Sequence, residues 1–168
     1  MKKLSEIRQK AQRVLSENGV ESSPVDIFGL IENEGIRILS EEMEDDHSGF
    51  LLVENGNATV AINSTHHSNR QRFTAAHELG HYFLHTQGKD GLFVDKAFKR
   101  SAVSSTGEDK MEIEANRFAA EVLMPKKVIE EKVGDNEITD LDVYRLANEF
   151  QVSDQAMTLR LVNLGLID

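Results

Sequence analysis

The sequence predicts an α+β protein in which helices surround one small sheet. Apolar residues at helical spacing mark both ends of the chain, and short apolar runs between residues 36 and 62 are typical of strands. The 168 residues suffice for one domain of ordinary size with a small appendage. With 39% apolar and 29% charged residues, the composition is that of a folded globular protein and not of a disordered one.

Two helices are expected at the start of the chain. The first is amphipathic, because five apolar residues share one helical face: Leu4, Ile7, Ala11, Val14 and Leu15. The second begins at residues 23–26, where Ser23 is expected to cap the helix and Pro24 to take its first position. Gly35 is a typical helix stop.

Three short strands follow and predict a small three-stranded sheet. They are expected at residues 36–39, 49–53 and 59–62, and the Asn55-Gly56 pair suits a tight hairpin turn between the last two. The acidic residues 41–46 are expected to form a solvated loop.

The second half of the chain is expected to be helical. Ser68 and Gln71 form a predicted capping box for a helix that runs to about Leu84. Residues 86–109 contain three glycines and indicate a long loop of the kind that is often functional. Further helices are expected at residues 110–124, 139–150 and 153–164, and a three-residue turn joins the last two.

The composition excludes several classes of function. The chain has no cysteine, so a metal must be held by His, Asp and Glu. With 29 acidic and 19 basic residues, the net charge of −10 argues against a direct nucleic-acid partner. No apolar run has the length that spans a bilayer, and the charged first residues differ from a signal peptide. We therefore expect a cytoplasmic protein with no membrane contact.

The residues His77-Glu78-Leu79-Gly80-His81 form an H-E-x-x-H motif inside a predicted helix. Residues four apart share a helical face, so both imidazoles can bind one ion, and zinc suits neutral imidazole. Glu78 then lies toward the open side of the ion, where it can take a proton from the attacking water. The good cap and the absence of proline favour a metal site over two packed histidines.

A catalytic zinc needs a third protein ligand. Glu112 is the preferred candidate, because it shares a helical face with Asn116, which can hydrogen-bond a ligand histidine from one turn away. Glu114, about 160° around that helix, is the alternative. His85 lies about 6 Å beyond His81 along the helix axis and is expected to pack or to support a ligand. Two further histidines, His66 and His67, are candidates only if their loop folds back.

The chain resembles the ImmA/IrrE family of metallopeptidases. The resemblance covers most of the sequence, and its most specific segments are NRQRFTAAHELGH (69–81) and EIEANRFAAEVLMP (112–125). Residues 152–161, 23–26 and 49–52 also fit, and Val122 stands where the family often has leucine. The resemblance implies a zincin-like, gluzincin-like domain over residues 1–133 and helix-turn-helix-like helices over residues 134–168.

The same resemblance implies the function. His77, His81 and Glu112 match the metal ligands and Glu78 matches the catalytic glutamate of a zinc-dependent endopeptidase. Its substrate is expected to be a regulatory protein, commonly a helix-turn-helix repressor in a mobile element, a stress response or a toxin–antitoxin pair. Manganese or iron can also occupy a site of two histidines and one carboxylate. The group that stabilises the transition state stays open among four residues: Tyr82, Tyr144, His47 and Arg100.

Two other functions compete with this expectation. The last two helices have the layout of a DNA-binding motif, but residues 135–168 contain seven acidic and two basic residues, a net charge of −5 that repels phosphates. These helices are therefore expected to cap the catalytic part or to dock a protein. The other alternative is a metal-binding regulator that acts by contact without catalysis, which the intact Glu78 disfavours.

Overall fold

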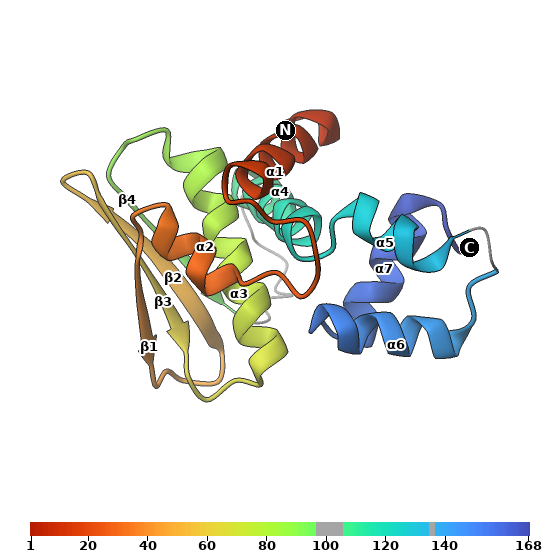
Figure 1. Ribbon diagram of the computed structural model, residues 1–168. Helices are drawn as coiled ribbons and strands as arrows, with labels where there is room; N and C mark the ends of the chain where they lie inside the picture. The colour runs from red at the N-terminus through yellow and green to blue at the C-terminus, as the bar shows by residue number, and fades with distance from the viewer. Residues whose placement is uncertain (97–105, 135–136) are drawn as a thin grey trace.

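A four-stranded sheet packed on helices forms the described part of the chain, residues 1–96, 106–134 and 137–168, in the computed structural model (Figure 1). The elements, in chain order, are α1 (Leu4–Glu17), α2 (Ile27–Asn33), β1 (Arg37–Glu41), β2 (His47–Glu54), β3 (Asn57–Asn63), α3 (Ser68–His81), the π-helical turn η1 (Tyr82–Thr86), β4 (Gly91–Lys96), α4 (Thr106–Leu123), α5 (Lys126–Val133), α6 (Asp140–Phe150) and α7 (Asp154–Leu164). The predicted α+β class is confirmed. Within the described ranges, no helix combines the length and the apolar character that crossing a membrane requires.

The sheet is built on a hairpin of β2 and β3. Asn55 and Gly56 in its turn have φ angles of 51° and 78°, the two positive values that a type I′ turn requires, so the predicted hairpin is confirmed. β2 and β3 pair antiparallel with Leu51 opposite Val60, and β1 joins the other side of β3 in parallel. Leu51 and Val60 are fully buried, whereas Leu52 on the other face is 37% exposed.

The prediction of three strands is wrong, because β4 lies within the segment that was expected to be a loop. β4 pairs antiparallel with β2, and Phe93 lies opposite Leu51. Leu92 and Val94 are 61% and 41% exposed, so this edge strand lacks the polar and apolar alternation that reveals a half-buried strand in a sequence. Its pairing partner, β2, lies far earlier in the chain, so the pairing leaves no local signal in the sequence.

Two helices have different capping residues from those that were expected. The cap of α2 is Asp26 and not Ser23, because the Asp26 side chain accepts a hydrogen bond from the Gly29 N–H at 3.1 Å, and aspartate caps as well as serine does. The cap of α3 is His67, one residue before the predicted one. Gln71 does not complete a capping box, since its amide donates to a loop carbonyl at 2.6 Å.

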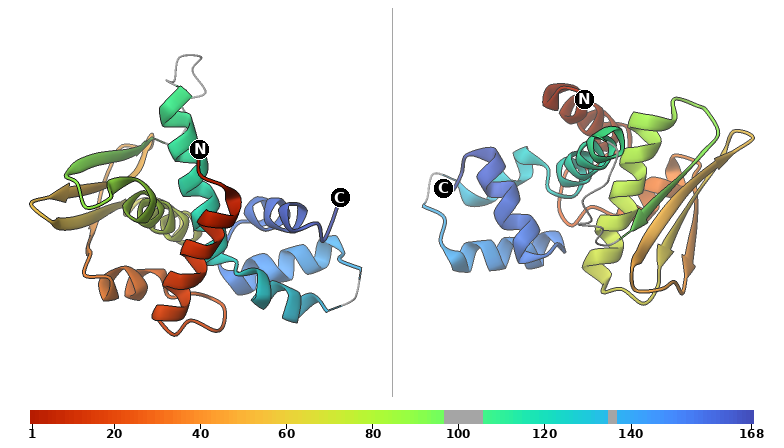
Figure 2. Two further views of the ribbon diagram at one scale, coloured as in Figure 1. Left: turned by 90° about the horizontal axis from the view of Figure 1, so that it is seen from above. Right: turned by 180° about the vertical axis from the view of Figure 1, so that it is seen from behind.

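The motif helix α3 lies between the sheet and α4, and α1 packs on α4 (Figures 1 and 2). The close approach of α3 and α4 depends on small residues. A Cβ placed on Gly80 would lie 3.1 Å from the Cα and the carbonyl oxygen of Ala115 and 3.3 Å from Cβ of Phe118. The contact therefore brings α4 against the end of α3 that carries His77 and His81.

The C-terminal helices are joined to the rest of the described chain by buried polar contacts. Arg160 of α7 forms two hydrogen bonds with the Glu121 carboxylate of α4, at 2.7 and 2.9 Å, and both side chains are 4% exposed. Arg160 also donates to the Met124 carbonyl at 3.0 Å. In Figure 1, α5, α6 and α7 form a group beside α4, away from the sheet. A domain boundary between residues 133 and 134 stays a prediction.

Candidate metal centre

Three side chains from α3 and α4 converge on one point. Nε2 of His77 lies 3.0 Å from Nε2 of His81 and 3.0 Å from Oε2 of Glu112. Nε2 of His81 lies 3.1 Å from the other carboxylate oxygen of Glu112. Both histidines are 2% exposed, whereas the Glu112 side chain is 44% exposed and completes the group from the solvent side.

The helical geometry of the motif explains this convergence. His77 and His81 are one turn apart, so their rings project from the same face of α3, with centroids 4.7 Å apart. Glu112 comes from the facing side of α4, where the small contact at Gly80 and Ala115 lets the two helices approach. A motif from one helix and a carboxylate from another thus build one group.

These donor atoms fit one divalent ion. Imidazole nitrogen and carboxylate oxygen are ordinary ligands of zinc. Bonds of about 2.0–2.2 Å at tetrahedral angles separate neighbouring ligand atoms by about 3.3–3.6 Å. The observed 3.0–3.1 Å needs only small side-chain adjustments to reach that spacing. The three residues could therefore hold a metal.

The electrostatics of the group favour an ionised Glu112. Burial by itself raises the pKa of the Glu112 carboxyl, but hydrogen bonds and positive charge from His77 and His81 outweigh it. The pKa therefore lies well below its ordinary value. Because a carboxylate must be deprotonated to bind a cation, Glu112 is ready to do so near neutral pH.

Both histidines also have partners for their other ring nitrogen. Nδ1 of His77 lies 2.9 Å from the side-chain oxygen of Asn116, which accepts and does not donate. A His77 that binds a metal through Nε2 carries its proton on Nδ1, and Asn116 is placed to accept the hydrogen bond from that N–H. Nδ1 of His81 lies 3.0 Å from Nδ1 of His85, so His85 contacts a motif histidine.

Glu114, the alternative third ligand, lies in a different environment from Glu112. It is 3% exposed, and its carboxylate lies 3.1 Å from Nε2 of His85 and accepts a hydrogen bond from the Lys2 backbone N–H. Burial raises the pKa of Glu114, but the Lys2 N–H, the His85 hydrogen bond and the Lys2 charge outweigh it, and the pKa is lowered. The geometry thus groups Glu112, and not Glu114, with the two imidazoles.

Sequence reasoning missed one aromatic neighbour of the site. Phe93 of β4 stacks on the His81 ring, with centroids 5.0 Å apart and an interplanar angle of 27°. The strand that carries Phe93 was expected to be a loop, so no local signal could place this ring. Among the described residues, Phe93 connects the edge of the sheet directly to the candidate metal centre.

The remaining predicted residues lie at different places. Glu78 follows His77 in α3 and is fully buried, and its role as a base stays a prediction. Three of the four candidates for stabilising the transition state lie on different elements: His47 pairs with Asp46 at 2.7 Å, Tyr82 packs edge-on against Phe83, and Tyr144 is 58% exposed on α6. The fourth, Arg100, lies outside the described residues.

Comparison with known proteins gives matches over most of the chain. The family model of the IrrE N-terminal-like domain, Peptidase M78, matches residues 31–162. The metallopeptidase ImmA of Bacillus subtilis (strain 168) is 28% identical over 125 residues, which are 74% of this chain and 67% of that protein. The uncharacterized immunity region protein 2 of Bacillus phage phi105 is 27% identical over 123 residues, or 73% and 71% of the two chains.

A solved structure is similar in fold. A transcriptional regulator of Mycobacterium tuberculosis superposes with a TM-score of 0.64 at 17% identity, over 94% of this chain and 46% of that one. This chain thus spans about half of that structure's length, and the likeness is one of fold alone. The matched family and the curated relative support a metallopeptidase that uses a divalent metal. Because the family model covers well over half of the sequence, the chain belongs to the Peptidase M78 family, that of the IrrE N-terminal-like domain, as its motifs predicted.

Proposed function

We propose that this protein is a zinc-dependent endopeptidase that cleaves a regulatory protein. One observation carries the proposal: Nε2 of His77 and Nε2 of His81 lie 3.0 Å apart, and each lies 3.0–3.1 Å from a carboxylate oxygen of Glu112, beside the motif that also supplies Glu78. In this proposal the first three residues hold the ion and Glu78 is the catalytic base. Asn116 orients His77 through its Nδ1 hydrogen bond.

The chemistry follows from the two carboxylates and their surroundings. A divalent ion held at this site supplies a Lewis acid that polarises the scissile carbonyl and acidifies water. Glu78 accepts the proton of the attacking water and passes it to the departing amine. Full burial in α3 keeps Glu78 fixed, so little freedom is lost when it acts. Zinc is our choice for this ligand set, and manganese would also accept it.

The edge of β4 is the proposed binding site for the substrate. β4 is the last strand of the sheet in the described part of the chain, and its Phe93 stacks on His81. An extended peptide can add to such an edge by main-chain hydrogen bonds. This addition would bring a peptide bond beside the two imidazoles. Because main-chain bonds are nearly blind to sequence, selectivity must come from another surface.

The proposed substrate is a DNA-binding repressor of the helix-turn-helix class. Its basic surface would complement a protein of net charge −10 and would speed their encounter. The helices α6 and α7, which lie in the C-terminal segment of net charge −5, are the proposed docking surface. Similarity to a phage immunity region protein supports a connection with gene regulation. Action on a repressor would place the protein in the cytoplasm.

A matched variant tests catalysis. Glu78→Gln keeps size and shape but removes the base, so we expect zinc to stay bound while cleavage of the cognate regulator stops. Fragments are measured by mass spectrometry, and one or two cuts at an exposed linker are expected. Cleavage by the unaltered protein should slow as salt rises, because screening weakens the charge attraction. Equal cleavage by the Glu78→Gln protein would reject the mechanism.

Two alternatives predict different results. A regulator that binds the zinc-loaded protein but stays intact would support a contact regulator without catalysis. Direct binding to DNA through α6 and α7 is disfavoured, because Arg160, one of two basic residues in the C-terminal segment, is buried against Glu121. A salt-sensitive submicromolar affinity for duplex DNA would contradict this view.

A further inference from the structure

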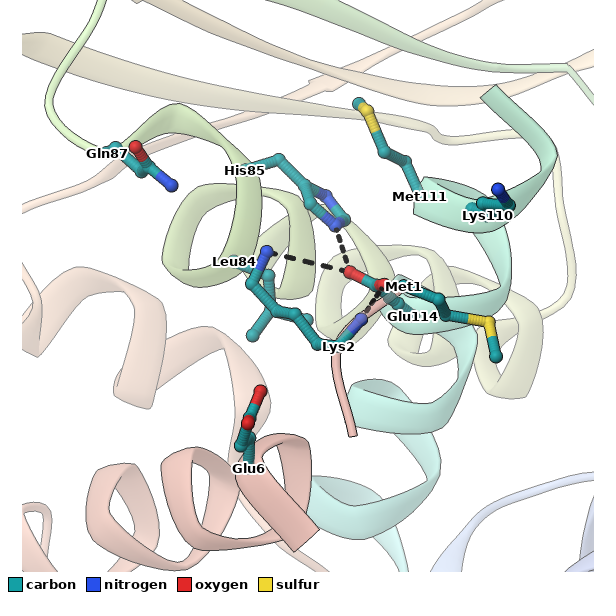
Figure 3. Close-up of a pocket in the computed structure, with 9 residues that line it drawn as sticks. All are labelled: Met1, Lys2, Glu6, Leu84, His85, Gln87, Lys110, Met111 and Glu114. Carbon is teal, nitrogen blue, oxygen red and sulfur yellow. Dashed lines mark hydrogen bonds and ion pairs between the residues drawn. The ribbon is translucent and has the colours of Figure 1, made fainter. Parts of the chain in front are cut away.

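A hollow of about 580 Å³ is lined by His85, the residue whose Nδ1 lies 3.0 Å from Nδ1 of His81 (Figure 3). Its wall is formed by the start of the chain, by η1 and by the first turns of α4. His85, Glu114 and Lys2 point toward one another there, as the close-up shows. Neither the H-E-x-x-H motif nor the proposed catalytic chemistry uses these side chains.

An unbroken series of contacts leads from His81 to the start of the chain. Nδ1 of His81 lies 3.0 Å from Nδ1 of His85, and Nε2 of His85 lies 3.1 Å from Oε2 of Glu114. Oε1 of Glu114 accepts the Lys2 backbone N–H, and the Lys2 ammonium lies 3.7 Å from Oε2. The side chains of His85 and Glu114 are 4% and 5% exposed, so water competes little for these contacts.

All the hydrogen bonds in this series can form with only one placement of the protons on the two imidazoles. If Nε2 of His81 is to bind a metal, its proton must lie on Nδ1 and be donated to Nδ1 of His85. His85 must then be neutral with its own proton on Nε2, which it donates to the Glu114 carboxylate. The opposite tautomer of His85 would set two N–H groups against each other at 3.0 Å.

We propose that His85 and Glu114 are positioning residues for His81, and that Lys2 holds Glu114 in place. His81 is held by an imidazole backed by a carboxylate, whereas His77 is held by the neutral amide of Asn116. The negative charge of Glu114, passed on through His85, fixes the ring of His81 and increases its strength as a donor. The proposal rests on His81 as a metal ligand and is independent of whether peptide is cleaved.

Zinc affinity tests the proposal, because it can be measured without a substrate. We expect Glu114→Gln and His85→Gln each to weaken Zn²⁺ binding by about 10–100-fold in competition with a chromophoric chelator. The double variant should bind no more weakly than the weaker single variant, because both changes interrupt one series of contacts. The visible spectrum of the Co²⁺-loaded Glu114→Gln protein should also shift, since the donor strength of His81 changes.

Glu6→Gln is the matched control, because Glu6 lines the same hollow and the change removes the same charge. Its zinc affinity should stay within a few-fold of the unaltered protein. Equal affinities of the Glu114→Gln and Glu6→Gln proteins would overturn the proposal. Thermal unfolding of the metal-free proteins shows whether a loss of zinc affinity comes from a loss of folding. If the Glu114→Gln protein does not fold, the zinc affinity of the His85→Gln protein decides the test. If the variants bind zinc more weakly but the unaltered protein does not cleave a regulator, the proposed function is rejected and this inference stands.

Discussion

At the residue scale, two glutamates of one helix lie in different surroundings. Glu112 faces His77 and His81 with a side chain that is 44% exposed, whereas Glu114 is buried against His85 and Lys2. The helical period explains the difference, because residues two apart point to opposite sides of the helix. Glu112 therefore faces the motif histidines, and Glu114 faces His85 and Lys2.

Substituting Glu112 tests its task as a ligand. We expect Glu112→Gln to lose the ion during gel filtration, because a neutral amide oxygen binds zinc far more weakly than a carboxylate does. Metal analysis of the eluted protein measures this loss. Glu114→Gln is the comparison and should retain more zinc. Should Glu114→Gln lose the ion while Glu112→Gln keeps one equivalent, the assignment of α4 to the site would be wrong.

The residues of the site differ in how well the sequence could predict them. His77 and His81 follow from spacing alone, since four residues make about one helical turn. Glu112 and Asn116 could be named because they share one face of a single predicted helix. Phe93 and Lys2 could not, because β4 and the start of the chain reach the site through folding, without any local pattern.

At the element scale, the approach of α3 and α4 sets the distance between the motif and Glu112. Gly80 sits at their contact, and an added Cβ would meet the Ala115 backbone at 3.1 Å. Glycine costs about 1 kcal/mol in a helix interior relative to alanine. This helix thus gives up stability for a close approach to α4.

Substituting Gly80 tests this reading. We expect Gly80→Leu to raise the free energy of the folded state by about 1–3 kcal/mol, because the side chain forces the two helices apart. Zinc binding should weaken too, since Glu112 moves away from the imidazoles. Urea unfolding and chelator competition measure the two effects. Gly80→Ala should stay within about 1 kcal/mol of the unaltered protein, as helix propensity offsets the tight contact. An unchanged Gly80→Leu protein would show that this contact does not set the helix spacing.

At the scale of the whole molecule, a buried ion pair joins the C-terminal helices to α4. Arg160 and Glu121 are both 4% exposed, and Arg8 of α1 adds a second contact to Glu121 at 3.1 Å. Burial raises the pKa of the Glu121 carboxyl, but hydrogen bonds and charges from Arg160 and then Arg8 outweigh it, so the pKa is lowered. Three helices therefore meet at one carboxylate.

Acid should weaken this connection. A carboxyl whose pKa is lowered by folding contributes stability above its unfolded pKa of about 4.3, and that contribution is lost as pH falls through the folded value. Glu121→Gln should cost about 3 kcal/mol at pH 7, because it leaves Arg160 buried without a counter-charge. The cost should shrink below about pH 4.

Urea unfolding of the metal-free proteins across this pH range measures the difference. Glu130→Gln, in the exposed pair with Lys126, is the control and should change stability by less than about 1 kcal/mol. A pH-independent cost for Glu121→Gln would contradict the ionised pair.

The sequence by itself determined the α+β class, the β2–β3 hairpin, the order of the helices apart from α5, and the family. Each of these depends on local spacing: the period of a helix, the positive φ angles of Asn55 and Gly56, or two histidines one turn apart. Only the tertiary structure decided that β4 completes the sheet, that Asp26 and His67 cap their helices, and that Lys2 reaches Glu114. These features depend on partners that are distant in the chain, or on a choice between two residues that can both cap a helix. A local sequence pattern cannot predict the pairing or the choice, because the free energy that decides them comes from contacts that exist only after the chain has folded.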